Sequence, residues 1–469
     1  MTKAAAAGVR RAVASTMVAL PTFFGPVAAA VAPEAPRTPP TNMSTPQAPR
    51  STHPLAQRLC ATLAARVDAV PGGGAALLRS WDDASGTGPA SEPALSTAAF
   101  AYDNALAAIA LLACGRSAQA LRLGEALLAA ATTDRAGAAG RLRNAYRAGP
   151  QRETPVPPAG WWDAAAGRWL EDPYQVGSST GNVAWVALAL LALADATGEA
   201  GNTGNAGNAG NAGNAARFHA GAARLARWAV DRTRSPRGPG GFSGGVHGFD
   251  DAPQPIGWKS TEHNVDLAAV FAWLADRGTR ALNRPADAQP TWSAQAAHAR
   301  AFLDAMWDPA AGRFAVGTLP DGATRARGRS ALDAQLWPLL LPDPPPAWRG
   351  ALAFVERAHA VGGGFDFDDD RDGVWVEGTA QAALVYRVVG REAPAGRLLD
   401  ALASDVSPGG YLWATRAPSI TTGLALGPDS TIDDFRYFRR PHLGATAWAA
   451  LAALGRNPMR PPATNPTKP

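Results

Sequence analysis

Six segments of the chain are apolar on nearly every side and are long enough to form helices. Residues 182–193 are the plainest case, since they read Asn-Val-Ala-Trp-Val-Ala-Leu-Ala-Leu-Leu-Ala-Leu. A helix that lacks a polar face is buried on all sides. The pattern therefore predicts six inner helices, at residues 102–114, 180–194, 261–275, 331–341, 377–389 and 442–454.

Six amphipathic segments alternate with these apolar ones and have Arg, Glu and Asp on one face. They lie at residues 54–67, 117–131, 216–232, 292–306, 346–358 and 394–403. One helical hairpin cannot bury its own apolar surface, so the hairpins must stack and the ring must close. The alternation predicts an all-α fold, an (α/α)6 barrel over residues 54–457. An open helical solenoid is the alternative, but its repeats would be more uniform in length.

The first 32 residues have the features of a signal peptide. Lys3, Arg10 and Arg11 give a positive start, no acid precedes Glu34, and an apolar stretch covers residues 12–32. The alternative is an uncleaved membrane anchor. Residues 33–53 form a Pro-rich linker, and residues 458–469 are predicted to be a disordered tail. We expect an exported protein, periplasmic or secreted, with no stable membrane span once the signal peptide is removed.

The net charge gives no sign of a nucleic-acid partner. The chain has 44 Lys and Arg against 39 Asp and Glu, a formal charge of +5. Loss of residues 1–32 removes three positive and no negative charges, which leaves +2 (5 − 3). A charge so close to zero provides no electrostatic footprint for nucleic acid.

Two further features are expected to be structural. The Gly-Asn-Ala repeat over residues 201–214 reads as a surface loop, because Asn and Gly favour turns. Cys60 and Cys114 fall on the first two predicted helices. Two buried free thiols are the favoured interpretation, and a disulfide formed in an oxidising compartment is the alternative.

The predicted starts of the inner helices are rich in polar groups. Capping explains any one acid at such a place. In a barrel, however, the loops that enter the inner helices gather at one end, so these side chains should converge on one cleft. The carboxylates are Asp103, Glu262, Asp333 and Glu377, and the other polar candidates are Tyr102, Asn182, His263, Asn264 and His442.

Aromatic residues cluster in the same loops. The chain has 15 Trp and only 6 Tyr, and flat indole faces are suited to stacking on sugar rings. We predict substrate contacts from Trp81, Trp162, Tyr174, Trp258, Trp375, Trp413 and Tyr437, with Trp161 in the same group of loop aromatics. Trp185, Trp273, Trp337 and Trp448 lie inside inner helices and are predicted to be core.

Four motifs resemble the six-hairpin glycosidase superfamily over roughly residues 54–456. They are Tyr102-Asp103-Asn104-Ala105-Leu106, Ser260-Thr261-Glu262-His263-Asn264, Glu377-Gly378-Thr379-Ala380-Gln381 and His442-Leu443-Gly444-Ala445-Thr446-Ala447-Trp448. The resemblance implies an (α/α)6 fold and hydrolysis of a polysaccharide or oligosaccharide, often with inversion.

We therefore expect a glycoside hydrolase that acts on a neutral glucan or a similar carbohydrate. Hydrolysis needs one carboxylic acid to protonate the leaving oxygen and a carboxylate that activates water or attacks the sugar. Glu262 is the first choice for the acid, because it lies between Trp258 and a buried helix. Asp103 is the first choice for the base, with Glu377 and Asp333 as alternates.

Two other functions remain open. One is a polysaccharide lyase or uronate epimerase on a related toroid, which would use groups among Tyr102, His263, Tyr437, Arg439 and Arg440. A uronate substrate would need a cationic cleft, for which the candidates are Lys259, Arg416, Arg436, Arg439 and Arg440. The other is a non-catalytic polysaccharide-binding protein of envelope polysaccharide assembly.

One candidate metal site competes for the acidic residues. Asp368, Asp370, Asp372 and Gly373 match the D-x-D-x-D-G opening of a calcium loop, but Thr379 stands where the pattern needs Glu. Calcium is thus the one candidate cofactor, with a solvated acidic turn as the favoured interpretation. A zinc site from His247, His263 and His442 fits no known spacing.

Export is directly testable. If residues 1–32 are a cleaved signal peptide, the mature protein begins near Pro33. Mass spectrometry of protein purified from its native host should find that N-terminus and no peptides from the first 32 residues. An intact Met1 on cytoplasmic protein would contradict export.

Overall fold

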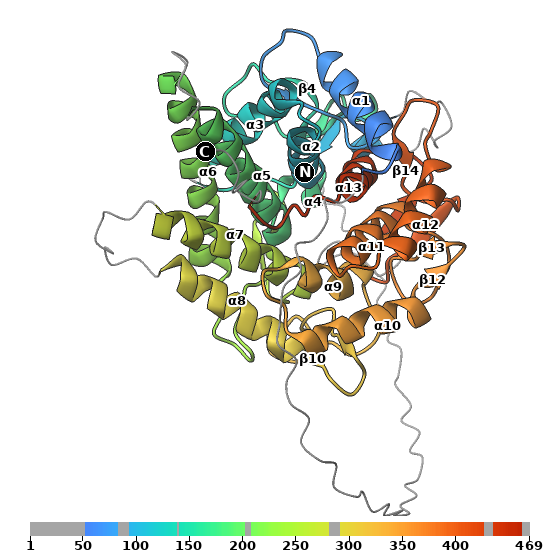
Figure 1. The fold of residues 1–469 in the computed structure, drawn as a ribbon. Coiled ribbons are helices and arrows are strands. Elements are labelled where there is room, and N and C mark those ends of the chain that lie inside the picture. The colour runs from blue at the N-terminus through green and yellow to red at the C-terminus, as the bar shows by residue number, and fades with distance from the viewer. Residues whose placement is uncertain are drawn as a thin grey trace, which may run out of the picture. The chain divides into compact units, whose positions relative to one another are not determined.

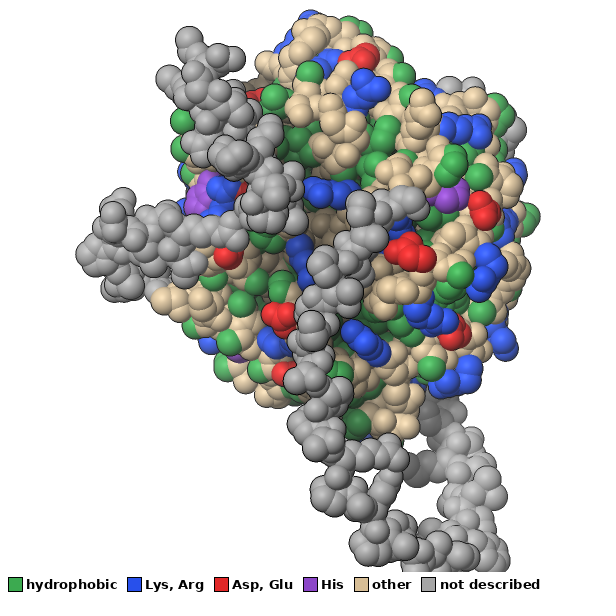
Figure 2. Space-filling model, viewed as in Figure 1, with side chains coloured by type: hydrophobic (Ala, Val, Ile, Leu, Met, Phe, Trp, Pro, Cys, Tyr) green, Lys and Arg blue, Asp and Glu red, His purple; other side chains and the backbone are tan. Residues whose placement is uncertain are grey.

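The structure is a computed structural model, drawn as a ribbon in Figure 1. It describes residues 52–82, 93–137, 140–201, 208–280, 291–425 and 435–461, all within one compact unit, Arg50–Pro469. On the face shown in Figure 2, Lys and Arg side chains are scattered among acidic and hydrophobic ones.

Two rings of helices form the barrel, as predicted (Figure 1). The inner ring comprises α2 (Ala101–Ala113), α5 (Thr180–Gly201), α7 (Thr261–Arg280), α9 (Leu332–Leu336), α11 (Val376–Val388) and α13 (Leu443–Leu454). The outer ring comprises α1 (Leu55–Asp68), α3 (Ser117–Thr132), α6 (Asn208–Thr233), α8 (Trp292–Met306), α10 (Gly350–Ala358) and α12 (Glu392–Ala403). A short helix, α4 (Pro173–Val176), lies in the loop before α5.

The inner ring closes on itself. Each inner helix packs against the next along the chain, and the last one, α13, packs against the first, α2. Burial separates the two rings: in α13 every residue from Leu443 to Ala453 is buried, whereas α8 buries one stripe that includes Ala299, Phe302 and Met306. The predicted division into inner and outer helices is confirmed.

The fourth inner helix is shorter than the predicted segment 331–341. α9 ends at Leu336 and continues as a 3₁₀ turn, η3 (Trp337–Leu340). Pro338 accounts for this, because proline has no N–H for the helical hydrogen bond and its ring clashes with the preceding turn. The segment remains buried throughout, so it still fills its place in the ring.

Short antiparallel strand pairs connect the loops. They are β1 (Ala76–Leu77) with β4 (Gly149–Pro150), β2 (Ala98–Phe100) with β3 (Ala145–Arg147), β5 (Trp161–Asp163) with β6 (Arg168–Leu170), β7 (Ser178–Ser179) with β8 (Gly245–His247) and β9 (Gln254–Ile256), β10 (Trp307–Asp308) with β11 (Arg313–Phe314), β12 (Ala360–Val361) with β13 (Gly364–Phe365), β14 (Leu412–Trp413) with β17 (Pro441–His442), and β15 (Ser419–Thr421) with β16 (Arg436–Phe438). Strands β2, β7 and β17 run directly into α2, α5 and α13 and so fix where these helices begin.

Helix α5 meets the length and composition criteria for a membrane-crossing helix. Its segment Thr180–Gly198 is 78% buried inside the structure. The barrel therefore covers most of this apolar surface.

The Gly-Asn-Ala repeat departs from the loop prediction. α5 extends to Gly201 and α6 already begins at Asn208, so part of the repeat is helical. Residues 202–207 lie outside the described residues. Starting a helix is costly, but extending an existing one adds a hydrogen bond with each residue. Two long neighbouring helices can therefore extend into residues that would not form a helix alone.

The C-terminal tail also departs from the prediction of disorder from residue 458. Met459 is buried, and Arg460 donates a hydrogen bond from Nε to the carbonyl oxygen of Leu340 (3.0 Å). The tail thus begins in contact with the barrel. Residues 1–51 and 462–469 lie outside the described residues, so the signal peptide, most of the linker and the rest of the tail stay predictions.

Cys60 and Cys114 form a disulfide, contrary to the favoured prediction of free thiols. Helices α1 and α2 pack together and bring the two Cα atoms to 5.6 Å, within the range that a disulfide spans. The bridge joins positions 54 residues apart and so links the first outer helix to the first inner helix.

Loss of this bridge should destabilise the protein. In the chain-entropy model, closing a loop of this length contributes roughly 4 kcal/mol, and measured values usually fall at 2–4 kcal/mol. The double variant Cys60→Ala/Cys114→Ala should lower the free energy of unfolding by about that amount in urea titrations. Dithiothreitol should lower the stability of the parent protein equally and leave the variant unchanged. Equal stability of parent and variant would show that the bridge is absent or without effect.

Candidate active site

Backbone pairing holds the starts of five inner helices. Besides β2, β7 and β17, single bridges join Ser260 to Gly317 just before α7 and Trp375 to Thr415 just before α11. The side chains that follow these anchors project from the first turn of each helix. The predicted convergence of polar helix starts therefore has a backbone cause.

Two adjoining cavities are lined by these helix starts and the loops before them. Their volumes are about 500 and 470 Å³, the size of small-molecule sites. Both are lined by Tyr102, Tyr174, Asn182, Phe435 and Tyr437, so they are two halves of one cleft. We name them the Glu262 half and the Asp103 half after a carboxylate that lines each.

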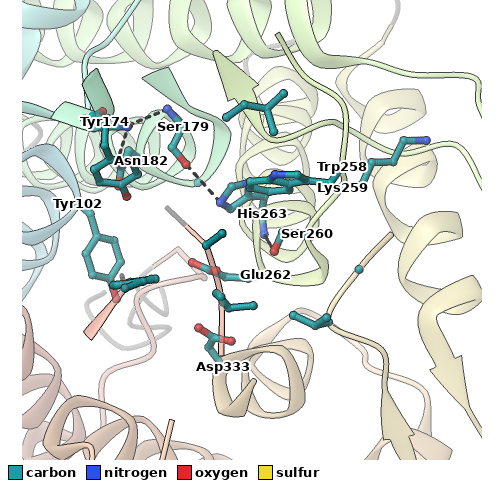
Figure 3. Close-up of a pocket in the computed structure, with 18 of the residues that line it drawn as sticks. Tyr102, Tyr174, Ser179, Asn182, Trp258, Lys259, Ser260, Glu262, His263 and Asp333 are labelled. Carbon is teal, nitrogen blue, oxygen red and sulfur yellow. Dashed lines mark hydrogen bonds between the residues drawn. The ribbon is translucent and has the colours of Figure 1, made fainter. Parts of the chain in front are cut away.

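Three carboxylates from three inner helices line the Glu262 half. Glu262, Asp333 and Glu377 begin α7, α9 and α11, and Figure 3 shows Glu262 and Asp333 directed into the same space. The pKa of Glu262 lies well above its usual value, first because of burial and then because of the negative charges of Asp333 and Glu377. Burial also raises the pKa of Asp333 to about 7. No hydrogen-bond donor to Glu262 is found among the described residues, so nothing there stabilises its charged form.

Glu377 has a different environment. It is 1% exposed, and the Tyr102 hydroxyl donates a hydrogen bond to its Oε1 (2.6 Å). The indole N–H of Trp448 donates in turn to the Tyr102 hydroxyl (2.8 Å). Burial raises the pKa of Glu377 to about 7, while His442 and the hydrogen bond from Tyr102 pull it down. Its charged form therefore has partners that Glu262 lacks.

His442 connects Glu377 to Asp103. Its Nε2 lies 3.5 Å from Asp103 Oδ2, and its Nδ1 lies 3.4 Å from Glu377 Oε2. Burial lowers the pKa of His442, but the charge and hydrogen bond of Asp103 and the charge of Glu377 outweigh it, and the pKa ends above its ordinary value. The indole of Trp81 stacks on the imidazole ring at 4.3 Å and holds its plane.

Gly444 leaves room for this cluster. A Cβ at this position would lie 2.6 Å from Asp103 Oδ1 and 2.9 Å from Glu377 Oε2. Both distances are shorter than real Cβ contacts. A side chain at residue 444 would therefore push apart the two carboxylates that face His442.

A fifth carboxylate, Asp266, was not predicted from the sequence pattern. It is fully buried one turn after Glu262 on α7, and its oxygens have no hydrogen-bond partner among the described residues. Burial, then Glu262 and Asp333, raise its pKa well above the usual value, with a small opposing effect of the Trp185 indole. Asp266 follows Glu262 by four residues, so both side chains lie on one face of the helix. This spacing is the signal that could have predicted Asp266 as part of the site.

Most of the predicted site residues line the cleft. Besides the four carboxylates and the shared Tyr102, Tyr174, Asn182 and Tyr437, the Glu262 half includes Trp258, His263 and Trp375, and the Asp103 half includes Trp81 and His442. His263 lies beside Trp258, its Nε2 is 3.3 Å from the Ser179 hydroxyl, and burial lowers its pKa to about 4.

Three predicted contacts lie elsewhere. Asn264 is fully buried and hydrogen-bonds the backbone of Phe242, because it follows Glu262 on the side of α7 that faces away from the cleft. Trp413 is buried in strand β14 under the guanidinium of Arg439. Trp162 is 63% exposed and does not line the cleft, whereas its neighbour Trp161 does.

Two tryptophans that were predicted to be core also line the cleft. Trp185 and Trp337 are almost fully buried, yet they form part of the surface of the Glu262 half. Each lies three or four residues after a predicted cleft residue, Asn182 or Asp333, and so lies on the same side of its helix.

Of the candidate cations of a uronate site, Arg436 and Arg440 line the Asp103 half, whereas Lys259 and Arg416 are engaged by other protein groups. Lys259 lines the Glu262 half, but its Nζ donates to the carbonyl oxygens of Arg237 and Gly240 (both 2.6 Å), and Figure 3 shows it extending away from Glu262. Arg416 is held by both carboxylate oxygens of Asp405 (2.8 Å each). The Glu262 half thus has a marked excess of carboxylates.

The predicted calcium loop is partly neutralised by an arginine. Arg329 Nη1 donates to Asp368 (2.6 Å) and to Asp370 (2.7 Å). Carboxylate oxygens of Asp366, Asp370 and Asp372 lie within 4.8 Å of one another, so Asp366 takes the place predicted for Asp368 in that group. Calcium binding stays a prediction.

Comparisons with known proteins agree on the architecture. No family model matches the chain, and no curated protein matches it by sequence. Among solved structures, a glycosidase aligns with a TM-score of 0.53 and 16% identity over 86% of this chain and 96% of its own. An α-amylase from Clostridium perfringens aligns at 0.52 and 9% identity over 87% and 99%. Cellobiose 2-epimerase from Spirochaeta thermophila aligns at 0.52 and 15% identity over 88% and 98%.

The chain has the (α/α)6-barrel fold of these solved structures. The alignments cover nearly the whole of each solved chain, so the likeness extends to the complete ring of hairpins. The fold predicted from the alternating helices is confirmed.

The buried carboxyl groups predict how stability depends on pH. Glu377 and Asp333 have pKa values raised to about 7 and Asp366 to about 8, so the folded protein holds protons that the unfolded chain has already released. Their stabilisation is complete below pH 4 or so and is lost as pH rises through 7–8. His263 and His359, with pKa values lowered to about 4, act in the opposite direction but only below about pH 6.5.

The melting temperature should therefore fall between about pH 6.5 and pH 8.5 in calorimetric scans. Glu377→Gln removes one of the titrating groups and should make this decline shallower. A melting temperature that stayed constant or rose over this interval would show that these carboxyl groups are not buried in their neutral form.

Proposed function

We propose that the protein is an exported glycoside hydrolase that cleaves a neutral polysaccharide or oligosaccharide. The observation that carries the proposal is the pair Glu262 and Glu377, which line the same half of one cleft from different inner helices. Glycosidic hydrolysis needs two carboxyl groups in different protonation states. Environments that push apart the pKa values of two nearby acids supply this difference.

Glu262 is assigned as the proton donor. Burial and the neighbouring negative charges raise its pKa well above the usual value, and no hydrogen-bond donor among the described side chains opposes this, so its environment favours the protonated form. Glu377 is assigned as the base or nucleophile, because Tyr102 donates to it and His442 lies beside it. Asp103, the first choice from the sequence, lies in the other half and acts through His442.

The lining of the cleft supports a carbohydrate ligand. Trp81, Trp258, Trp337 and Trp375 line the cleft. Their flat indole rings suit the C–H faces of pyranoses. Solved structures with this fold include a glycosidase with glucose bound. The excess of carboxylates in the Glu262 half favours a neutral sugar over a uronate.

A second candidate is sugar epimerisation, and His263 favours it. His263 lines the cleft and its imidazole is neutral at pH 7, because burial lowers its pKa to about 4, so it has a free site for a proton. The same shift makes it a weak base, since a general base is most effective with a pKa near the working pH. One neighbour by structure is a cellobiose 2-epimerase. Epimerase activity would convert a disaccharide without releasing reducing ends, and lyase activity would produce an unsaturated sugar that absorbs in the ultraviolet. Binding without turnover would indicate the non-catalytic alternative.

Removal of either carboxyl group should abolish hydrolysis. Glu262→Gln keeps the size of the side chain but cannot donate the proton, and Glu377→Gln cannot act as base. Each should lower turnover of neutral glucans at least roughly 10²-fold, the lower end of acid–base contributions. Release of reducing ends measures the effect.

Matched controls separate chemistry from folding. Glu125→Gln makes the same change on outer helix α3, where Glu125 pairs with Arg217, and should retain activity. Azide should restore part of the cleavage by Glu377→Ala, since a small anion can replace a missing carboxylate, but should not restore Glu262→Gln. Because attack by azide breaks the glycosidic bond and forms a glycosyl azide, this rescue is measured as shortening of the substrate and not as reducing ends. Full activity of Glu262→Gln would transfer the acid role to Asp333 or Glu377.

A further inference from the structure

The exposed large hydrophobic side chains gather around the cleft. Among the described residues they are Trp162 (63% exposed), Leu319 (45%), Phe249 (42%) and Trp169 (37%). Leu319 lines the Glu262 half, and Phe249 follows strand β8, whose His247 lines that half. Trp162 and Trp169 lie on the β5–β6 hairpin, whose Trp161 lines the Asp103 half. Exposed apolar groups confined to one region mark an interaction surface.

The β5–β6 hairpin presents two indoles on one face. Trp162 and Trp169 are direct partners across the two strands, so their side chains project from the same side. Successive side chains of a strand point to opposite sides, which directs Trp161 to the cleft and Trp162 away from it. The pair therefore lies on the outer face of the hairpin whose inner face borders the Asp103 half.

Trp169 is fixed in position by its neighbours. The guanidinium of Arg147 lies 4.5 Å from the centre of its ring. Its indole also packs closely over Gly160, where a Cβ would lie 2.3 Å from the ring nitrogen. The guanidinium covers one face of the Trp169 ring, so Trp162, which is 63% exposed, supplies the more open stacking face and Arg147 supplies hydrogen-bond donors.

We propose that Trp162 and Trp169, with Arg147, form a glycan-binding surface that holds the polysaccharide chain where it leaves the Asp103 half of the cleft. The inference rests on the proposed function and specifies its substrate as a polymer that extends beyond the cleft. Indole faces stack on the C–H faces of the sugar rings, and the Arg147 guanidinium donates hydrogen bonds to the hydroxyl groups.

The size and position of the surface favour a glycan over a protein partner. Two aromatic side chains bury roughly 150–250 Å² each. A stable protein interface buries about 1,000 Å² or more, so this pair alone is too small for one. A sugar chain needs only a few ring contacts at each position, and the cleft supplies the rest through Trp161.

Affinity electrophoresis of the full chain tests this surface. The parent is Glu262→Gln, which keeps the cleft but is expected not to cleave the ligand, run in native gels that contain hydroxyethyl cellulose, laminarin, soluble starch or dextran. Adding Trp162→Ala should weaken binding to the polysaccharide that retards the parent by about tenfold, which corresponds to roughly 1.4 kcal/mol of lost stacking. Trp162→Phe keeps an aromatic face and should restore most of the affinity.

The possible failures are distinguishable. Unchanged retardation after Trp162→Ala, or a parent protein that none of the four gels retards, overturns the surface. A change in oligomeric state by size-exclusion chromatography with unchanged retardation overturns it in favour of contact with a second copy. If Trp162→Ala weakens binding while no hydrolysis is found for the native protein, the glycan-binding surface is supported and the proposed hydrolase activity is contradicted.

Discussion

The contact between α13 and α2 closes the ring, and the candidate site depends on it. The two helices are at opposite ends of the chain. Asp103 and Tyr102 begin α2, while His442 caps the start of α13 and Trp448 lies within it. The pair Asp103–His442 and the hydrogen bond from Trp448 to Tyr102 both cross this seam, and His442 and Tyr102 each contact Glu377 on α11. The charged cluster therefore assembles only when α13 packs against α2 and closes the barrel.

The helical architecture could be predicted from the sequence because burial leaves a strong periodic signal. A helix covered on all sides, such as α13, needs apolar residues all round, and a half-covered helix such as α8 needs one stripe. Features that depend on relative rotation were harder to predict. The sequence pattern places Cys60 and Cys114 on consecutive helices. Whether their side chains meet depends on the rotation of α1 and α2 about their own axes, which the pattern does not give.

The location of the site could be predicted from the sequence better than the chemical roles of its residues. Helix starts converge in any such barrel, so Glu262, Asp333 and Glu377 were accessible to pattern reasoning. Which of them is charged depends on partners from distant parts of the chain: Glu377 has Tyr102 and His442, and Glu262 has other acids. The choice between Trp161 and Trp162 likewise depends on the pairing register of a two-stranded hairpin, which single-residue properties do not encode.

The strand pairs and bridges at the helix starts hold the frame through backbone hydrogen bonds. Ser260 with Gly317 and Trp375 with Thr415 are examples. These bonds use backbone atoms, although the pairing itself can require a glycine: a Cβ at Gly317 would lie 1.9 Å from the carbonyl oxygen of Lys259. The side chains just after the paired residues take no part in these bonds and can differ in chemistry while the helix starts keep their places. Solved chains that share only 9–16% of their residues with this one align over nearly their whole length. The polar side chains at the helix starts of such a barrel can therefore change in evolution while the helices that position them stay the same.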